Sequence, residues 1–85
     1  MALTAPEWLA RHGGSLLPAS DGRTWFVMLE GQPQYTLAPV PVQGQFGCSI
    51  LQTINGRRVD SSATATSAEE ALRAGLEDLR KALGW

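Results

Sequence analysis

The last part of the chain shows the clearest periodic pattern of hydrophobic positions. Over residues 68–83, small and hydrophobic side chains recur at intervals of three and four, and charged side chains fill the positions between them. This spacing is typical of an amphipathic helix with one buried stripe. Ser67 and Glu70 form a capping box at its start, and Gly84 suits a left-handed residue at its end. The pattern therefore predicts a helix over residues 67–83.

The two faces of this predicted helix carry different information. Gly75 lies within the hydrophobic stripe, where a glycine costs about 1 kcal/mol relative to alanine. Because Ala68 and Ala71 on the same face are also small, we expect the helix to approach a sheet closely there. The opposite face carries two pairs of charges at the spacing that favours ion pairs, namely Glu69 with Arg73 and Glu77 with Lys81.

Alternating positions in the middle of the chain predict a β-hairpin. The first strand begins at Phe46, and its candidate inner face consists of Phe46, Cys48, Ile50 and Ile54. Asn55-Gly56 follows and suits a type I′ turn, so residues 57–61 are expected to return as the partner strand. Residues 61–66 are small and polar, and they either continue this strand or form the loop into the last helix.

Two further segments before this hairpin have strand character. Residues 23–29 are rich in aromatic and hydrophobic side chains, which indicates a strand. Residues 34–38 form another candidate strand, which runs into Pro39 and Pro41. Because each proline lacks a backbone donor, we expect residues 34–42 to form either an edge strand or an extended loop.

A short helix is predicted near the N-terminus. Thr4 and Glu7 have capping-box spacing, Pro6 is tolerated in the first turn, and Gly13-Gly14 ends the helix. The resulting order is α-β-β-β-α, with a fourth strand left open. We therefore predict a single α+β domain over residues 1–85, in which an antiparallel sheet of three to four strands has two helices packed on one face.

Composition narrows the classes of function and the location. The chain has 7 Lys and Arg against 8 Asp and Glu, so it is neither a polybasic binder nor an acidic tail. Cys48 is the only cysteine, which excludes a disulfide within the chain and favours a small buried side chain in a reducing compartment. No secretory leader and no long apolar span are visible. We therefore expect a cytoplasmic protein without membrane contact.

No set of residues in the sequence predicts catalysis. His12 is the only histidine, and a general base acts together with a nucleophile and an orienting group. Zinc sites use three or four ligands, and His12 with Cys48 does not make such a set. A glycine-rich phosphate loop followed by lysine is also missing. We predict that the chain is not an enzyme, with no catalytic, cofactor or metal residues and no small-molecule ligand.

The predicted order of elements resembles the double-stranded-RNA-binding domain. The best match runs from Phe46 to Leu83, and residues 6–13 are similar to a short version of that family's first helix. The resemblance implies an α+β fold. The family contacts phosphates with lysines at the start of its second helix, where this chain has Ala68, Glu69 and Glu70. Binding to nucleic acid is therefore disfavoured, and the alternative is an RNA-binding module with a degenerate surface that uses Arg23, Arg57 and Arg58.

The aromatic residues favour protein–protein contacts. Three tryptophans in 85 residues are a high share for a thin core, and interfaces favour Trp, Tyr and Arg as anchors. Trp85 either folds back onto the end of the last helix or lies exposed as a contact residue. We predict a small non-enzymatic domain that acts through a protein partner or through self-association as a homodimer. The candidate contact residues are Arg23, Trp25, Tyr35, Val40, Arg57, Arg58 and Trp85.

Overall fold

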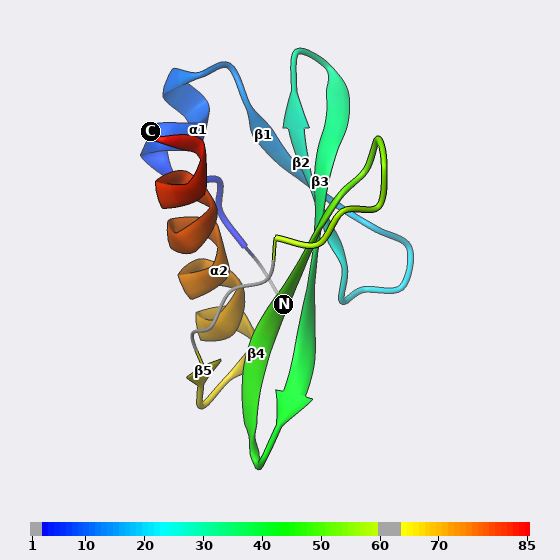
Figure 1. Cartoon of the computed structure of the whole chain (residues 1–85), viewed down its shortest axis with the longest axis vertical. Coiled ribbons are helices and arrows are strands. Elements are labelled where there is room, and N and C mark those ends of the chain that lie inside the picture. Colours follow the sequence, from blue (N-terminus) through cyan, green and yellow to red (C-terminus); the bar gives the residue numbers. More distant parts are fainter. Residues whose placement is uncertain (1–2, 60–63) are drawn as a thin grey trace.

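The computed structural model describes residues 3–59 and 64–85, which form a layer of sheet and a layer of helix. The elements are α1 (Glu7–Arg11), β1 (Ser15–Pro18), β2 (Trp25–Leu29), β3 (Gln32–Val42), β4 (Gln45–Gln52), β5 (Thr64–Ala65) and α2 (Ala68–Leu83). The strands form one antiparallel sheet in the order β1-β2-β3-β4-β5. Both helices lie on the same side of the sheet, on the left in Figure 1. The predicted α+β class and antiparallel sheet are confirmed.

The sheet has five strands, which corrects the predicted three to four strands and the α-β-β-β-α order. Strand β1 is missing from the sequence prediction because it is only four residues long and ends in Pro18. Such a strand is tolerated at a sheet edge. The predicted partner strand over residues 57–61 is reduced, in its described part, to a bridge between Leu51 and Arg58. Pairing with β4 resumes at β5, and residues 60–63 lie outside the described residues.

The proline-containing segment is a strand along its whole length. The β3 residues 35–37 pair with both β2 and β4, Gln32 and Pro33 pair only with β2, and residues 38–42 pair only with β4. Pro39 and Pro41 lie in this last part, at positions whose backbone nitrogen faces away from β4. The two prolines therefore interrupt no hydrogen bond of the β3–β4 ladder. Of the two predicted structures, the edge strand applies to this part, and the loop is excluded.

Type I′ turns occur at two places, neither of which is the predicted one. Glu30-Gly31 joins β2 to β3 and Gln43-Gly44 joins β3 to β4, and both residues of each turn have positive φ. At Asn55-Gly56 only the glycine has positive φ, so the predicted type I′ turn there is wrong. The Asn55 side chain accepts a hydrogen bond from the Arg57 amide at 2.9 Å, which stabilises a longer turn.

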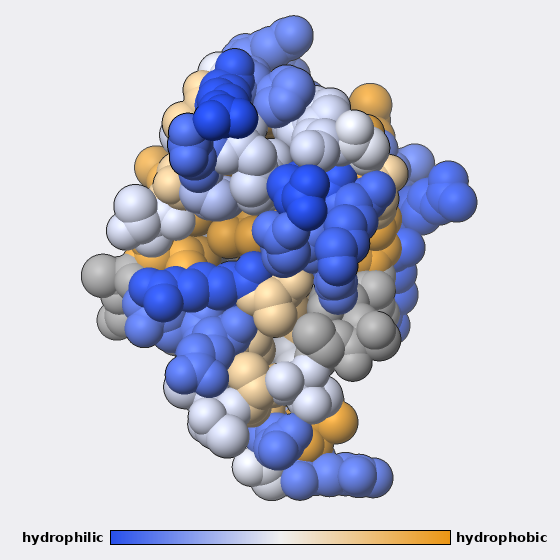
Figure 2. All heavy atoms as spheres, turned by 90° about the vertical axis from the view of Figure 1, so that its left-hand side faces the viewer, coloured by the Kyte–Doolittle hydropathy of each residue, from blue (hydrophilic) through white to orange (hydrophobic). Residues whose placement is uncertain are grey.

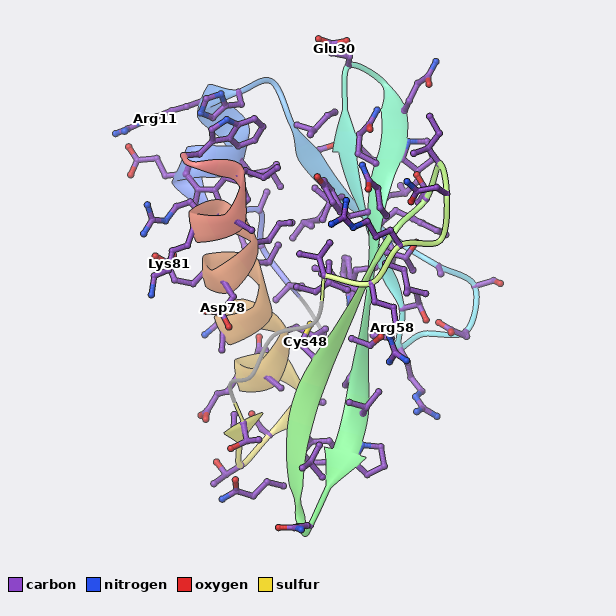
Figure 3. The ribbon with its side chains drawn as sticks, in the orientation of Figure 1. Arg11, Glu30, Cys48, Arg58, Asp78 and Lys81 are labelled. Atoms are coloured by element: carbon purple, nitrogen blue, oxygen red, sulfur yellow. The ribbon has the colours of Figure 1, made fainter. Side chains whose placement is uncertain are left out.

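The core lies between the sheet and α2, with Leu9 of α1 completing it. The largest fully buried side chains are Val27, Leu37 and Ile50 of the sheet, Leu72 and Leu79 of α2, and Leu9 of α1. Cys48 is buried, and Figure 3 shows it between the sheet and α2. Of the predicted inner face, Phe46 is half-buried, whereas Ile54 is 82% exposed because it lies in the turn after β4.

At Gly75, α2 lies in close contact with Cys48 of β4. A Cβ atom built on Gly75 would lie 2.7 Å from the Cβ of Cys48 and closer still to its Sγ. Real Cβ atoms essentially never come within 3.0 Å of such neighbours. The predicted close approach of the helix to the sheet is confirmed, and only a glycine fits this position without a displacement.

The caps and ion pairs of the helices follow the sequence in part. Ser67 accepts a hydrogen bond from the Glu70 amide at 3.2 Å, and Gly84 adopts the left-handed conformation with φ of 76°. The predicted Glu69–Arg73 pair is present, whereas Glu77 pairs with Arg80 instead of Lys81. Helix α1 begins directly after Pro6, so the capping role predicted for Thr4 is wrong.

Candidate interaction surface

The sheet face opposite the helices carries a row of side chains that crosses four strands. Leu17 of β1 pairs with Phe26 of β2, Phe26 pairs with Thr36 of β3, and Thr36 pairs with Leu51 of β4. Successive residues of a strand point to opposite faces, so this row faces away from the buried Val27, Leu37 and Ile50. We call Leu17, Phe26, Thr36 and Leu51 the outer row.

The outer row exposes hydrophobic surface. Leu17 is 51% exposed and Leu51 is 36% exposed, while Phe26 and Thr36 between them are half-buried. The neighbours on the same face are Met28, Ala38 and Val40. Figure 2 looks onto the helical side and shows hydrophilic side chains over most of it, with hydrophobic atoms visible between them. Neither helix covers the outer row, because both lie on the other side of the sheet.

The loop between β1 and β2 holds the charged side chain of Asp21 by hydrogen bonds within the loop. The carboxylate of Asp21 accepts hydrogen bonds from the Thr24 hydroxyl at 2.6 Å and from the amides of Arg23 and Thr24 at 2.9 and 2.8 Å. These bonds, with the Thr24 hydroxyl first, lower the pKa of Asp21 from 3.8 to about 2. Asp21 therefore stays ionised to a lower pH than an ordinary aspartate.

The structure places four of the predicted contact residues at the surface near the outer row or in the loops around it. Val40 is half-buried on the outer face. Arg58 is exposed opposite Leu51, and Figure 3 shows it on the side of the sheet away from α2. Arg23 is exposed in the loop before β2, and Arg57 is exposed in the turn after β4.

Two other predicted contact residues belong to the inner face. Trp25 is only 8% exposed and lies in the core, because strand alternation places it on the same face as Val27. Its Nε1 atom is buried and has no hydrogen-bond partner among the residues that the structure describes. Tyr35 is half-buried against the core. Trp25 is therefore not available to a partner on the folded domain, and its predicted role as a contact residue needs this correction.

The ring of Trp85 lies against α1, a placement that differs from the predicted one on the end of the last helix. Its ring stacks on His12 with centroids 3.8 Å apart and an angle of 10°, and it lies 5.8 Å from the ring of Trp8. It is still 36% exposed. Figure 1 shows the C-terminal end beside α1, at the far end of α2. The seven predicted contact residues therefore do not form one surface. Four lie on or around the outer face of the sheet, Trp25 and Tyr35 lie on its inner face, and Trp85 lies against α1.

The outer row contains the residues that sequence reasoning missed. The sequence contains a signal for Leu51, because this hydrophobic residue lies at one of the positions that alternate with the predicted inner face of β4. Leu17 carried no such signal, since β1 itself was not predicted. Phe26 lies within a predicted strand, but its face depends on a register that the sequence does not show.

Known proteins give no further guide to this surface. Comparisons with family models, with curated proteins and with solved structures each found no match to this chain. Within residues 3–59 and 64–85, no group of three or more His, Cys, Asp or Glu side chains could hold a metal ion. In that same part of the chain, neither helix has the length and apolar character needed to span a bilayer.

Proposed function

We propose that this chain is a non-enzymatic domain that acts through protein–protein contacts and that its outer row binds a second copy of the same chain. The observation that carries the proposal is the hydrophobic row from Leu17 to Leu51 on a sheet face that neither helix covers. Exposed hydrophobic side chains that form one row, bordered by polar loops, are typical of interaction sites. A two-fold homodimer is the commonest way in which such a surface is buried.

The size of the face limits the area that two copies can bury. The β3–β4 ladder has eight residue pairs. At about 3.4 Å per residue and about 4.8 Å between four strands, the outer face measures at most about 400 Å² in projection, because β1 and β2 are shorter than this ladder. Two copies would bury roughly 800 Å², which is below the 1,200–2,000 Å² of stable complexes. The proposed dimer is therefore a weak and transient one.

Sedimentation velocity over a range of protein concentrations tests this proposal. We expect the wild-type chain to show a reversible monomer–dimer equilibrium. Leu17→Glu and Leu51→Glu place a charge in the contact, so each should shift the chain to monomer. Ile54→Glu is the matched control, because Ile54 is a more exposed hydrophobic residue outside the row. A wild-type monomer at about 1 mM, or equal effects of all three variants, would contradict the proposal.

RNA binding is the alternative function, and the same preparation separates the two. Arg58 lies opposite Leu51, beside the outer row, and Arg23 and Arg57 lie in exposed loops. Titration with duplex RNA at low and moderate salt would show salt-sensitive binding if these arginines neutralise phosphates. Loss of such binding in Arg57→Ala/Arg58→Ala would favour the alternative.

We place the protein in the cytoplasm, which its single buried thiol supports.

A further inference from the structure

The turn after β4 carries an asparagine followed by a glycine, and Asn55 is the only asparagine of the chain. We propose that Asn55 is a modification site, at which the folded protein spontaneously loses the side-chain amide and acquires a carboxylate. The backbone nitrogen of Gly56 is the nucleophile, and water completes the reaction. This proposal concerns the chemistry of one turn, so it is independent of the proposed self-association.

The reaction needs water as its only co-reactant. The Gly56 nitrogen gives up its proton to a solvent base and attacks the side-chain carbonyl carbon of Asn55. A bond forms between these two atoms, the side-chain amide bond breaks, and ammonia leaves with a proton from solvent. Water then opens the resulting five-membered ring at either carbonyl, which gives aspartate or isoaspartate. The net change is gain of water and loss of ammonia, without oxidation or reduction.

Two features of the turn favour the attack. A Cβ atom built on Gly56 would meet no heavy atom within 4 Å beyond its chain neighbours, so no other group crowds this peptide. The Asn55 Oδ1 atom accepts a hydrogen bond from the Arg57 amide at 2.9 Å, which holds the side chain along the backbone of Gly56. Oδ1 takes up negative charge during the attack, and an N–H that is already directed at such an oxygen stabilises it.

One hydrogen bond of the turn opposes the attack. The Gly56 amide donates to the Gln52 carbonyl at 2.8 Å, and this bond must open before the nitrogen can lose its proton. The turn residues 53–57 are all exposed, so water can replace the Gln52 carbonyl as the partner of this amide. Exposed turns of this kind open locally, without unfolding of the whole domain. We therefore expect local opening of the turn to set the rate.

The Asp21-Gly22 pair shows the opposite situation in the same chain. Ring closure at an aspartate requires the protonated carboxyl group, because a carboxylate is a poor electrophile. The hydrogen bonds from Thr24 and from the Arg23 amide lower the pKa of Asp21 to about 2, so it is ionised at neutral pH. Asn55 carries no charge, and its one described hydrogen bond assists the attack. The structure therefore favours modification at Asn55 over Asp21.

The modification would change the charge beside two arginines. A carboxylate at position 55 lies next to Arg57 and Arg58, and Arg58 pairs with Leu51 of β4. Aspartate can still accept the hydrogen bond from the Arg57 amide, and a charged acceptor strengthens it. Isoaspartate lengthens the backbone by one methylene group, so it should displace the turn. The two products are therefore expected to differ in structure, although they have the same mass.

Incubation of the folded wild-type chain in mildly alkaline buffer tests the proposal. Intact mass spectrometry should show a gain of one mass unit, and peptide mapping should locate it at Asn55 as a mixture of aspartate and isoaspartate. Asn55→Gln is the matched control, because it keeps the amide but would need a six-membered ring, which closes far less readily. This variant should lose the mass gain over the same period. Asp21 should remain unmodified in the folded wild-type chain.

A parallel incubation in urea gives the rate for the unfolded chain. Reaction through global unfolding alone would be about 10³-fold slower in the folded chain, or slower still. A folded chain that reacts at Asn55 faster than this limit supports the proposal, because local opening then suffices. Slowing by about 10³-fold or more overturns it, since the bond from Gly56 to Gln52 then protects the turn. An equal mass gain in Asn55→Gln also overturns it, because another amide is then the source.

Discussion

Replacement of Gly75 by alanine sets two opposing effects against each other. In the interior of α2, alanine is favoured over glycine by about 1 kcal/mol. The added methyl group would lie 2.7 Å from the Cβ of Cys48, which is fixed to the backbone of β4 and cannot rotate away. Overpacking of this kind costs about 1–3 kcal/mol. The contact is shorter than the limit for real Cβ atoms, so we place the cost at the upper end of this range.

We therefore expect Gly75→Ala to lower the free energy of unfolding by about 1–2 kcal/mol. Urea denaturation followed by circular dichroism measures this change. Ala74→Gly, at the neighbouring position of the same helix, gives the cost of glycine without the contact. In a Cys48→Ala background the Sγ atom is gone, so Gly75→Ala should cost less there. A Gly75→Ala variant that is about 1 kcal/mol more stable than wild type would refute the reasoning.

Two further predictions concern groups outside the core. Because its folded pKa of about 2 lies below its ordinary 3.8, Asp21 stabilises the fold above the ordinary pKa, and this contribution is lost as the pH falls towards 2. Asp21→Asn should therefore lower the midpoint of urea unfolding at pH 7 and have little effect at pH 2; equal effects would contradict this. Trp85→Ala removes the ring stacked on His12, so the ring-current shift of the His12 imidazole protons should disappear in proton NMR spectra. The free energy of unfolding, measured by thermal denaturation, should fall by about 0.5–1.5 kcal/mol. An unchanged His12 spectrum would show that the stack does not form in solution.

The sequence predicts those elements whose signals are local. Helix α2 has an unbroken period, a serine at its start and a glycine at its end, so its limits agree with the structure. The turn at Asn55-Gly56 shows the weakness of a two-residue rule, since the Asn55 side chain holds a different turn. Glu30 and Gln43 adopt the positive φ instead, which is uncommon for residues of these types.

The candidate surface depends on information that is not local. The outer row joins residues as far apart in the chain as Leu17 and Leu51, and it exists only in one register of four strands. A shift of one residue in any strand would move its side chains to the other face. The resemblance to the double-stranded-RNA-binding domain likewise stays a prediction, and the five strands found here exceed the three of its α-β-β-β-α order.

The prolines of the sheet have a consequence for growth of an assembly. A strand with free donors and acceptors at a sheet edge is a template on which further chains can add without limit. Pro39 and Pro41 remove donors from the open part of β3, and Pro18 does the same on β1. Addition of strands at these edges is thereby obstructed, while the outer face stays accessible. In the proposed self-association, contact across the face ends when two copies have met, so pairing at high concentration is not expected to lead to fibres.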